Sequence, residues 1–473
     1  MAHHFEADSK TLLLHEQQEK KKEGDCIVDI TEEKQKQEPG GKCISRVNSA
    51  LTKTNEDAYK PKLISIGPYH MKDPGLENGV KQDFQKSVFK TIDGFKEDST
   101  KRLTELKDKA RSWYAEDTQH MNDAEFVDML LLDGCFVLEF LEKLDKGEVT
   151  DDVFMKVSGK VYQTSTDMLL FENRLPFFVL FELYKLKKCG CTSSGSDHRP
   201  ENDNENDDNA ALLLQDLIVL VKKSFGTQVP KLTPRNVVAH EYKAPDVLPK
   251  HLIQVVHSLC IPRNAKCPSN VCDSGGMIEQ INTATELQDN GIGFMKIGNV
   301  YEGYFDDKEG PNFNANDGTT MFDLDFNNGI LKIPSFMIQD NTETFLRNMI
   351  AYEQHSRDAP MCFTDFACFM DELIESTTDV NLLRRRGIII NWLATDDMVT
   401  KMFYNLCQDV IAYNTYSELI KKVNRHGNKA WNIWYGKLRH DLFYSPWKLI
   451  STVVGGLVVT LGTAVTLKNL FGY

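Results

Sequence analysis

Two aspartates one residue apart, Asp323 and Asp325, have the spacing that comes nearest to a known chemistry in this sequence. In a turn, such a pair can hold a divalent cation through two carboxylate oxygens. Here the pair alternates with Phe322, Leu324 and Phe326, and successive side chains of a strand point to opposite faces. The pattern therefore predicts two solvated carboxylates on the polar face of a strand.

Thiol and imidazole groups, which are usual ligands of zinc, gather in two places. The two sets are Cys189 and Cys191 with His198, and Cys260, Cys267 and Cys272 with His257. The first set lacks a second close pair of ligands, and the second set contains no C-x-x-C knuckle. Both are interpreted as incidental clusters, so the sequence predicts no metal site.

Motifs whose spacing is dictated by a catalytic mechanism are missing from the sequence. It has no GxxxxGK[ST] phosphate loop, no HExxH zinc pair, no GxSxG nucleophile elbow and no set of kinase motifs. Gly291, Gly293 and Gly298 miss the dinucleotide spacing, and nothing in the sequence brings His70 to the thiol of Cys135. These absences predict no cofactor and weigh against an enzyme.

An enzyme of unrecognised type remains the alternative hypothesis. Its site would assemble from distant polar residues, for which the candidates are Asp323, Asp325, Glu353 and Asp365.

The charge balance limits the possible partners. A net charge of −14, from 55 Lys and Arg against 69 Asp and Glu, argues against a surface that binds nucleic acid through its phosphates. The basic triplet from Arg384 to Arg386 could bind acidic lipid headgroups or an acidic peptide. Because Gly387 follows it, we favour a helix C-terminus whose dipole the three arginines complement.

The eleven cysteines are scattered, several of them inside apolar runs, which is typical of reduced thiols in an intracellular protein. A recognition module on the secretory side of a membrane is a third hypothesis. It would require the opposite topology and would be supported by disulfides among Cys260, Cys267 and Cys272.

The elements that position these residues are predicted to be mostly helices. Residues 126–144 are apolar nearly all round and predict a buried helix. In residues 167–186, Pro176 either kinks a helix or opens a second one. Further helical periodicity covers residues 364–375, 379–392, 395–413 and 416–443, with Thr395 as an N-cap.

A small sheet is also predicted. Phe322, Leu324 and Phe326 alternate before a turn at Asn328-Gly329, after which an apolar run resumes, and this pattern is typical of a hairpin. Residues 291–297 could pair with the hairpin, and residues 64–68 are interpreted as a strand that runs into a turn. The predicted fold class is mainly α (α+β): a helical body with a small antiparallel β-sheet and a C-terminal transmembrane helix.

The last apolar run, from Leu449 to Leu467, carries no charged residue. Nineteen residues make a helix of roughly 28 Å, close to the ~30 Å hydrocarbon core of a bilayer. A single membrane span is therefore predicted, with a buried core helix as the alternative. The residues chosen to represent the span are Leu449, Val454, Gly456, Thr460, Ala464 and Leu467.

The flanks of this run predict its orientation and one possible contact. Lys437, Arg439 and Lys448 precede it and Lys468 follows it, so the positive-inside rule leaves the large N-terminal part in the cytosol. Whether the membrane is the plasma membrane or an internal one stays open. Self-association is a hypothesis, because four small residues share one helix face: Thr452, Gly456, Thr460 and Ala464.

The composition divides the chain into three parts. Residues 1–42 are polar and rich in Lys and Glu, which is typical of a disordered leader. Residues 43–445 form the body, interrupted by a polar, acidic stretch at 187–210 that predicts a mobile loop. Residues 446–473 form the membrane anchor and a short tail.

Several stretches, taken in order, resemble the plant family catalogued as domain of unknown function 247, or uncharacterised protein family 0481. The resemblance runs from about Cys43 to the end of the chain. It is carried by NEDAYKPKLISIGPYH (55–70), LLLDGCFVLEFL (130–141), LLFENRLPFFVLFELY (169–184), TATELQDNGIGF (283–294), FDLDFNNGILKIPSF (322–336), NTETFLRNMIAYEQ (341–354), DVNLLRRRGIIIN (379–391) and the Trp-rich segment 431–451.

This resemblance implies single-pass membrane proteins without established catalytic residues, and a recognition role for a few relatives. One departure is His70-Met71-Lys72, where the family often has His-His-Gly. The leading hypothesis is therefore a membrane-anchored protein that acts through an unknown protein partner in recognition or signalling.

Overall fold

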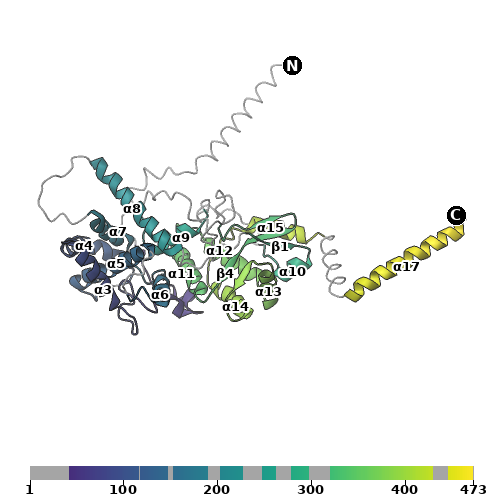
Figure 1. Ribbon diagram of the computed structural model, residues 1–473, viewed down its shortest axis with the longest axis horizontal. Coiled ribbons are helices and arrows are strands. Elements are labelled where there is room, and N and C mark those ends of the chain that lie inside the picture. The colour runs from purple at the N-terminus through teal and green to yellow at the C-terminus, as the bar shows by residue number, and fades with distance from the viewer. Residues whose placement is uncertain are drawn as a thin grey trace, which may run out of the picture. The chain divides into compact units, whose positions relative to one another are not determined.

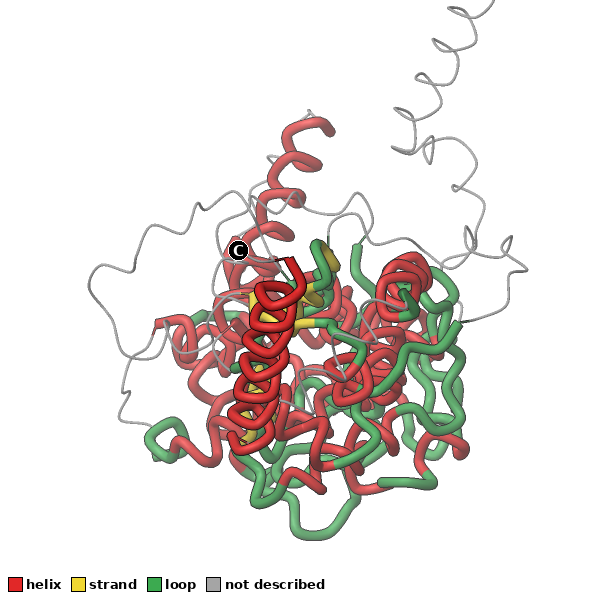
Figure 2. The backbone as a smooth tube through the Cα atoms, turned by 90° about the vertical axis from the view of Figure 1, so that its right-hand side faces the viewer, coloured by secondary structure: helices red, strands yellow, loops and turns green. Residues whose placement is uncertain are grey.

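The chain divides into two units, Met1–Lys42 and Cys43–Tyr473, and the second is described below. The computed structural model describes residues 42–116, 118–146, 153–189, 203–226, 248–262, 279–297, 320–429 and 446–471 (Figure 1). Within these ranges the protein is mainly helical with a small amount of sheet, as Figure 2 shows.

Helices make up the first half of the second unit. They are α2 (Ser49–Thr52), the 3-10 helix η2 (Glu56–Tyr59), α3 (Val80–Thr91), α4 (Phe95–Ser112), α5 (Asp123–Lys146), α6 (Ser158–Asp167), α7 (Phe177–Cys189), α8 (Asp203–Gly226) and α9 (Leu252–Cys260). Helix α5 packs against α3, α4, α7 and α8 (Figure 1). Neighbours on several sides explain why its residues are apolar nearly all round, and the predicted buried helix is confirmed.

Pro176 opens a second helix and does not kink a continuous one. Helix α6 ends at Asp167 and α7 begins at Phe177, because proline suits a position just before a helix and breaks one in the interior. The predicted loop at 187–210 is wrong at both ends, since α7 continues to Cys189 and α8 begins at Asp203. Its middle, 190–202, lies outside the described residues.

The second half of the unit mixes helices with short strands. In chain order these are α10 (Ala284–Asp289), β1 (Gly293–Ile297), β2 (Asp325–Asn327), β3 (Ile330–Pro334), β4 (Phe336–Ile338), α11 (Thr342–His355), α12 (Cys362–Leu373), α13 (Thr377–Arg385), β5 (Ile389–Asn391), α14 (Asp396–Leu406), α15 (Ser417–Gly427) and α17 (Pro446–Phe471).

The predicted hairpin is confirmed, but the sheet is mixed. Strands β2 and β3 pair antiparallel around Asn328 and Gly329, whose φ angles of 51° and 75° suit the type I′ turns that Asn-Gly favours. Strand β1 pairs with β3 in parallel, so the prediction of an antiparallel sheet is wrong for that strand. A chain that returns through a long connection can pair in either direction, and the residue pattern does not distinguish them.

A second, two-stranded sheet corrects one predicted helix. Residues 379–392 were predicted to be helical throughout, but α13 ends at Arg385 and β5 pairs in parallel with β4. Gly387 makes the break, with a φ of +71° that favours glycine. The arginine triplet therefore lies at a helix C-terminus, as its favoured interpretation predicts, and Arg384 is paired with Asp396 at 3.3 Å.

Two other helix predictions extend too far. The side chain of Thr395 caps α14 by accepting from the N–H of Met398, as predicted, but the helix ends at Leu406 and not at residue 413. Asp409, three residues after the helix, has a φ of 57° that a right-handed helix does not allow. Further on, the carboxylate of Asp365 binds the N–H groups of residues 413–415 and holds them in a loop. Of the predicted helix 416–443, α15 covers Ser417–Gly427, and residues 430–443 lie outside the described part.

The C-terminal apolar run is helical, as predicted, and lies within α17. Among the described residues, however, no helix combines the length and the apolar character that crossing a membrane requires. The predicted transmembrane helix is therefore not supported by the structure.

The apolar side chains of the body, from Ile44 to Val423, form one continuous buried cluster. Helix α11 packs against η2, α9, α12 and α14, so it joins the helical first half to the mixed second half. Burial of this cluster is the main force that holds the two halves together.

Candidate functional site

A segment of the first half, residues 62–67, belongs to no strand. Residues 64–68 were predicted as a strand that runs into a turn, and the prediction of a strand there is wrong. Side chains bind every one of their backbone N–H groups. The acceptors are Asp167 for residues 62–64, Asn78 for Ser65, Asn173 for Ile66 and Asp133 for Gly67.

We call these four acceptors, Asn78, Asp133, Asp167 and Asn173, the polar frame. Asp133, Asp167 and Asn173 are at most 1% exposed. Burial raises the pKa of Asp167, and the N–H groups that it accepts oppose that rise. Burial also raises the pKa of Asp133, against the pull of the Lys81 ammonium 2.6 Å away. The frame satisfies backbone groups that a neighbouring strand would otherwise bind.

His70 was considered above as a possible partner of the Cys135 thiol, but its ring nitrogens contact other side chains. Its Nδ1 lies 2.7 Å from Asp73 and its Nε2 lies 3.1 Å from Glu172. Burial alone would raise the pKa of Glu172, but the hydrogen bonds of His70 and of the Val47 N–H, with the charge of Arg46, hold it below its ordinary value. Both ring nitrogens therefore contact carboxylates, and these contacts hold the turn at His70 in place.

Each carboxylate named by the enzyme hypothesis has hydrogen-bond or ion-pair partners of its own. Asp323 accepts from the N–H and the hydroxyl of Thr320, and Asp325 pairs with Lys332 at 3.1 Å. Asp365 holds the 413–415 loop. Glu353 is fully buried and accepts from the N–H groups of residues 363 and 364 and from His257. Burial raises the pKa of Tyr416, and the charges of Asp323, Glu353 and Asp365 all contribute to the rise, but no hydrogen bond among the described residues joins one of the four carboxylates to another.

The thiol clusters are resolved only in part. His257 is bonded to Glu353 at 2.8 Å and Cys260 is a buried free thiol, whereas Cys267 and Cys272 lie outside the described residues. Cys191 and His198 lie outside them as well. In the part of the chain that the structure describes, no three His, Cys, Asp or Glu side chains gather as a metal would need.

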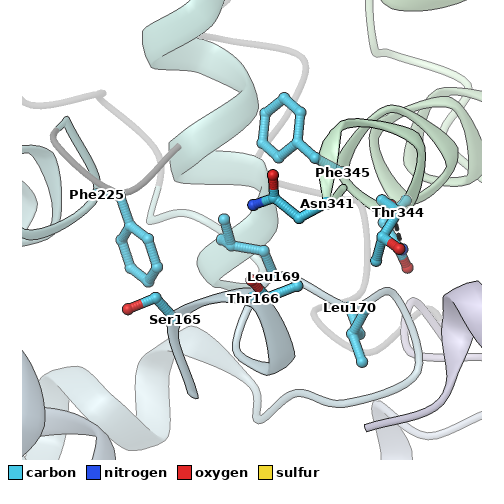
Figure 3. Close-up of a pocket in the computed structure, with 9 residues that line it drawn as sticks. Ser165, Thr166, Leu169, Leu170, Phe225, Asn341, Thr344 and Phe345 are labelled. Carbon is cyan, nitrogen blue, oxygen red and sulfur yellow. Dashed lines mark hydrogen bonds between the residues drawn. The ribbon is translucent and has the colours of Figure 1, made fainter. Parts of the chain in front are cut away.

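A small cavity between α6, α8 and α11 is part of the packing. Figure 3 shows the side chains that line it, among them Leu169, Phe225 and Phe345. Its volume of about 10 Å³ is near the minimum that holds one water molecule. The Oδ1 atom of Asn341, which is buried without a hydrogen-bond partner, supplies a polar group to such a water. The cavity is too small for a substrate.

A larger open groove of about 560 Å³ lies between α10, α12 and α14. We call it the acidic groove, after the four carboxylates of Glu286, Asp371, Glu372 and Glu375. The other lining residues are Gln280, Ile281, Asn282, Thr283, Ile374, Thr400, Lys401 and Tyr404. Its single cation, Lys401, is paired at 2.6 Å with Asp397, which is not among the lining residues.

Two adjacent acids give the groove its electrostatic character. Burial, with the neighbouring charge of Glu372, raises the pKa of Asp371 to about 6. Burial also raises the pKa of Glu372, although the N–H of Ile281 donates to that carboxylate at 3.0 Å. No cation among the described residues forms an ion pair with Asp371. Two like charges that are partly buried repel each other, which is costly in the absence of a cation. The groove therefore lacks a positive charge that would offset this repulsion.

Sequence reasoning missed the groove, although one signal was present. Asp371 and Glu372 lie in the last turn of α12, and that turn contains no basic residue. Acidic side chains are unfavourable at a helix C-terminus, where the helix dipole is negative. Such a placement indicates either that a nearby group offsets the unfavourable charge or that the acids have a function. Carboxylates in a cleft whose pKa values are shifted are candidates for a functional site.

The side chains chosen to represent the membrane helix are exposed where they are described. Val454 is 52% exposed and Leu467 is 56% exposed, and Gly456 has open space around it. The hydroxyls of Thr460, Thr463 and Thr466 donate to carbonyls of α17 itself. The helix therefore presents apolar side chains, while the hydroxyls of these three threonines are bonded within the helix.

Comparison with known proteins confirms the family resemblance. Residues 44–461 match DUF247, described as a plant protein of unknown function. UPF0481 protein At3g47200 of Arabidopsis thaliana is 26% identical over 432 residues, covering 89% of this chain and 84% of that protein. Putative UPF0481 protein At3g02645, from the same plant, is 21% identical over 492 residues, covering 88% of each. No solved structure matches. Since the match spans most of its length, the chain belongs to the DUF247 family of plant proteins.

Proposed function

We propose that this protein is an interaction component that α17 attaches to a membrane and whose acidic groove binds a basic segment of a partner protein. The observation that carries the proposal is the half-buried Asp371–Glu372 pair, which no described cation neutralises. A lysine or arginine side chain placed there would remove the like-charge repulsion and form charge-assisted hydrogen bonds.

The lining of the groove supports a side chain of this kind. Tyr404 is 58% exposed and offers an aromatic face, over which ammonium and guanidinium groups bind favourably. Ile281 and Ile374 also line the groove, although at most 5% of either residue is exposed. A groove of about 560 Å³ that opens to solvent fits a segment of a partner chain.

The surface of α17 supports membrane attachment. Between Leu449 and Leu467 the helix carries no charge, and the described large apolar side chains in that range are more than half exposed. Monomeric proteins rarely expose a continuous apolar surface of this extent to water. Because the described threonine hydroxyls are bonded within the helix, they could enter an apolar phase without an unsatisfied donor.

Two finer features belong to the same proposal. Between residues 437 and 448, three basic residues precede the apolar run 449–467, and one follows the run. This excess supports a body that faces the cytosol. The face formed by Thr452, Gly456, Thr460 and Ala464 supports close approach of a second copy of the helix.

The groove is tested by titrating a fluorescent Lys/Arg-rich peptide with the detergent-solubilised full chain. A peptide of the same length with Glu in place of the basic residues is the control. We expect binding of the basic peptide alone, weakened as the salt concentration rises, because partly exposed charges are screened. Equal binding of both peptides, or binding of neither, would exclude the groove as a basic-peptide site.

Membrane attachment is tested by carbonate washing and protease protection of vesicles that carry the chain with a tag at each end. The double variant Val458→Lys/Leu461→Lys should shift the protein to the supernatant. The matched control Met295→Lys changes an exposed apolar residue of β1 and should leave it in the pellet. If the unaltered chain is released by carbonate, the attachment is peripheral or absent.

A further inference from the structure

Helix α15 is the last helix before α17 among the described residues, and one of its sides is fixed to the body. Ile420, Val423 and Gly427 are buried on that side. The helix packs against β2, and the ring of His426 contacts that of Phe326, with 5.5 Å between the ring centroids. The three-stranded sheet therefore holds α15 by its apolar side.

The opposite side of α15 is basic. Lys422 and Arg425 lie on it, and Lys429 follows just after the end of the helix. Spacings of three and four residues put these side chains on one face, and all three residues are exposed. No described carboxylate forms an ion pair with any of the three, and Glu418, the acid of this helix, is paired with Lys421 at 2.9 Å.

Two ordinary explanations account for part of this charge. Basic residues complement the dipole at a helix C-terminus, which explains Arg425 and Lys429 but not Lys422. Exposed charges also keep a surface solvated, but both signs serve that purpose, and this part of the chain is biased to one sign. In residues 417–448 the acidic residues are Glu418 and Asp441, and the basic residues are Lys421, Lys422, Arg425, Lys429, Lys437, Arg439 and Lys448.

The bias is local, because the whole chain has a net charge of −14. A strongly acidic chain that lies beside an acidic membrane surface is repelled by it, and a basic segment next to the attachment point offsets that repulsion. The position of the basic residues, directly before the apolar run 449–467, therefore matches a partner of negative charge at the membrane.

We propose that the basic face of α15, formed by Lys422, Arg425 and Lys429, binds the headgroups of acidic phospholipids in the membrane to which α17 attaches the chain. Clusters of Lys and Arg beside a membrane segment are attracted to the acidic lipids of the cytoplasmic leaflet. The inference rests on the proposed attachment through α17 and deepens it, because it names the class of lipid and a second contact with the membrane.

The connection to α17 allows a weak contact to be sufficient. Lys429 and Pro446 are 17 residues apart, a distance of at most roughly 60 Å even for a fully extended chain. A site held this close to a surface meets it at an effective concentration on the order of millimolar. Three basic side chains can then hold α15 at the surface, although each of them contributes little alone.

The test places the full chain in vesicles of phosphatidylcholine alone or of phosphatidylcholine with phosphatidylserine. Exposed lysines are acetylated with sulfo-NHS-acetate, which does not cross membranes, and the labelling of each lysine is measured by mass spectrometry. We expect phosphatidylserine to lower the labelling of Lys422 and Lys429 about fivefold at low salt, with recovery at high salt. Lys86, whose side chain is 64% exposed on α3, is the internal control and should not change.

A pair of matched variants tests which charges are responsible, with Lys429 as the reporter in both. Lys422→Glu/Arg425→Glu reverses the basic face and should remove the effect of phosphatidylserine. Lys90→Glu/Lys96→Glu changes the net charge by the same amount at two exposed lysines of α3 and α4 and should retain it. The decisive measurement uses the unaltered chain, so a variant that fails to fold does not affect it.

Equal labelling of Lys422 and Lys429 in the two kinds of vesicle overturns the proposal. Labelling that is equally low in both overturns it too, because a protein surface would then cover the face. So does an equal fall at Lys86, which would mean that the whole body adsorbs to acidic lipid. Labelling precedes a carbonate wash. Release of the chain from both kinds of vesicle by that wash would contradict attachment through α17, whereas the labelling still decides the role of α15.

Discussion

The polar frame and the acidic groove are two sets of carboxylates that the fold treats in opposite ways. In the frame, Asp133 and Asp167 are fully buried and every oxygen accepts a hydrogen bond, from backbone N–H groups, from Lys81 or from Gln163. In the groove, Asp371 is half-buried beside another acid and has no cationic partner among the described residues. The frame carboxylates therefore maintain structure, whereas the proposed function assigns the groove carboxylates to a basic partner.

The largest effect is expected where the frame loses a charge partner. Lys81→Met leaves the carboxylate of Asp133 buried without its cation, and such a loss costs about 3–5 kcal/mol of the free energy of unfolding. Chemical denaturation of the solubilised chain measures the change. The double variant Lys81→Met/Asp133→Asn should recover part of the loss, because the remaining amide is neutral. A loss below about 1 kcal/mol for Lys81→Met would show that the pair is not structural.

A slightly smaller loss is expected when the frame loses an acceptor. Asp167→Ala leaves three N–H groups of residues 62–64 without a partner, at about 1 kcal/mol or more for each. The unfolding free energy should fall by about 3 kcal/mol. Asp167→Asn keeps one acceptor oxygen and should fall between Asp167→Ala and the unaltered chain. If the alanine variant is as stable as the unaltered chain, other groups bind these amides.

The affinity of the acidic groove for a basic peptide should depend on pH. With a pKa of about 6, Asp371 is mostly protonated at pH 5 and mostly ionised at pH 7. A basic peptide binds the ionised form, so its affinity should rise several-fold over this range. Fluorescence titration at several pH values measures it. A flat profile would mean that Asp371 does not contact the peptide.

The smallest effect is expected for the stability of a groove variant. The folded-state pKa of Asp371, about 6, lies above its ordinary value of 3.8, so the folded chain binds the proton more tightly. Its ionisation therefore lowers stability as the pH rises from about 4 to about 6. Asp371→Asn should remove that slope and, at pH 7, leave the unfolding free energy equal or up to about 0.5 kcal/mol higher. A clear destabilisation would place Asp371 in the same class as Asp167.

The sequence predicted the elements whose cause is local. The Asn328-Gly329 hairpin, the Thr395 cap and the buried helix α5 each follow from a short pattern of residues. So does the end of α13, where the arginine triplet meets Gly387, although the periodicity of residues 379–392 suggested a longer helix. Local glycine chemistry decided that boundary.

Features that depend on distant partners were not predictable. The 62–67 segment has the alternation of a strand, but Asp167 and Asn173, about a hundred residues further on, occupy its N–H groups. Likewise Asp365, about fifty residues before them, binds the N–H groups of residues 413–415 and holds them in a loop where a helix was predicted. The acidic groove combines α10, α12 and α14, and only their packing brings Glu286 and Asp371 to the same groove.

The most direct test compares the affinity of a Lys/Arg-rich peptide for Asp371→Asn and for Asp325→Asn at pH 7. Both changes remove one negative charge, but Asp325 pairs with Lys332 outside the groove. Asp371 has no cationic partner among the described residues, so we expect its change to Asn to lower the affinity for the peptide about tenfold, as for the loss of one charge-assisted contact. The affinity should change little for Asp325→Asn. Equal losses would contradict this expectation, because binding would then follow net charge alone.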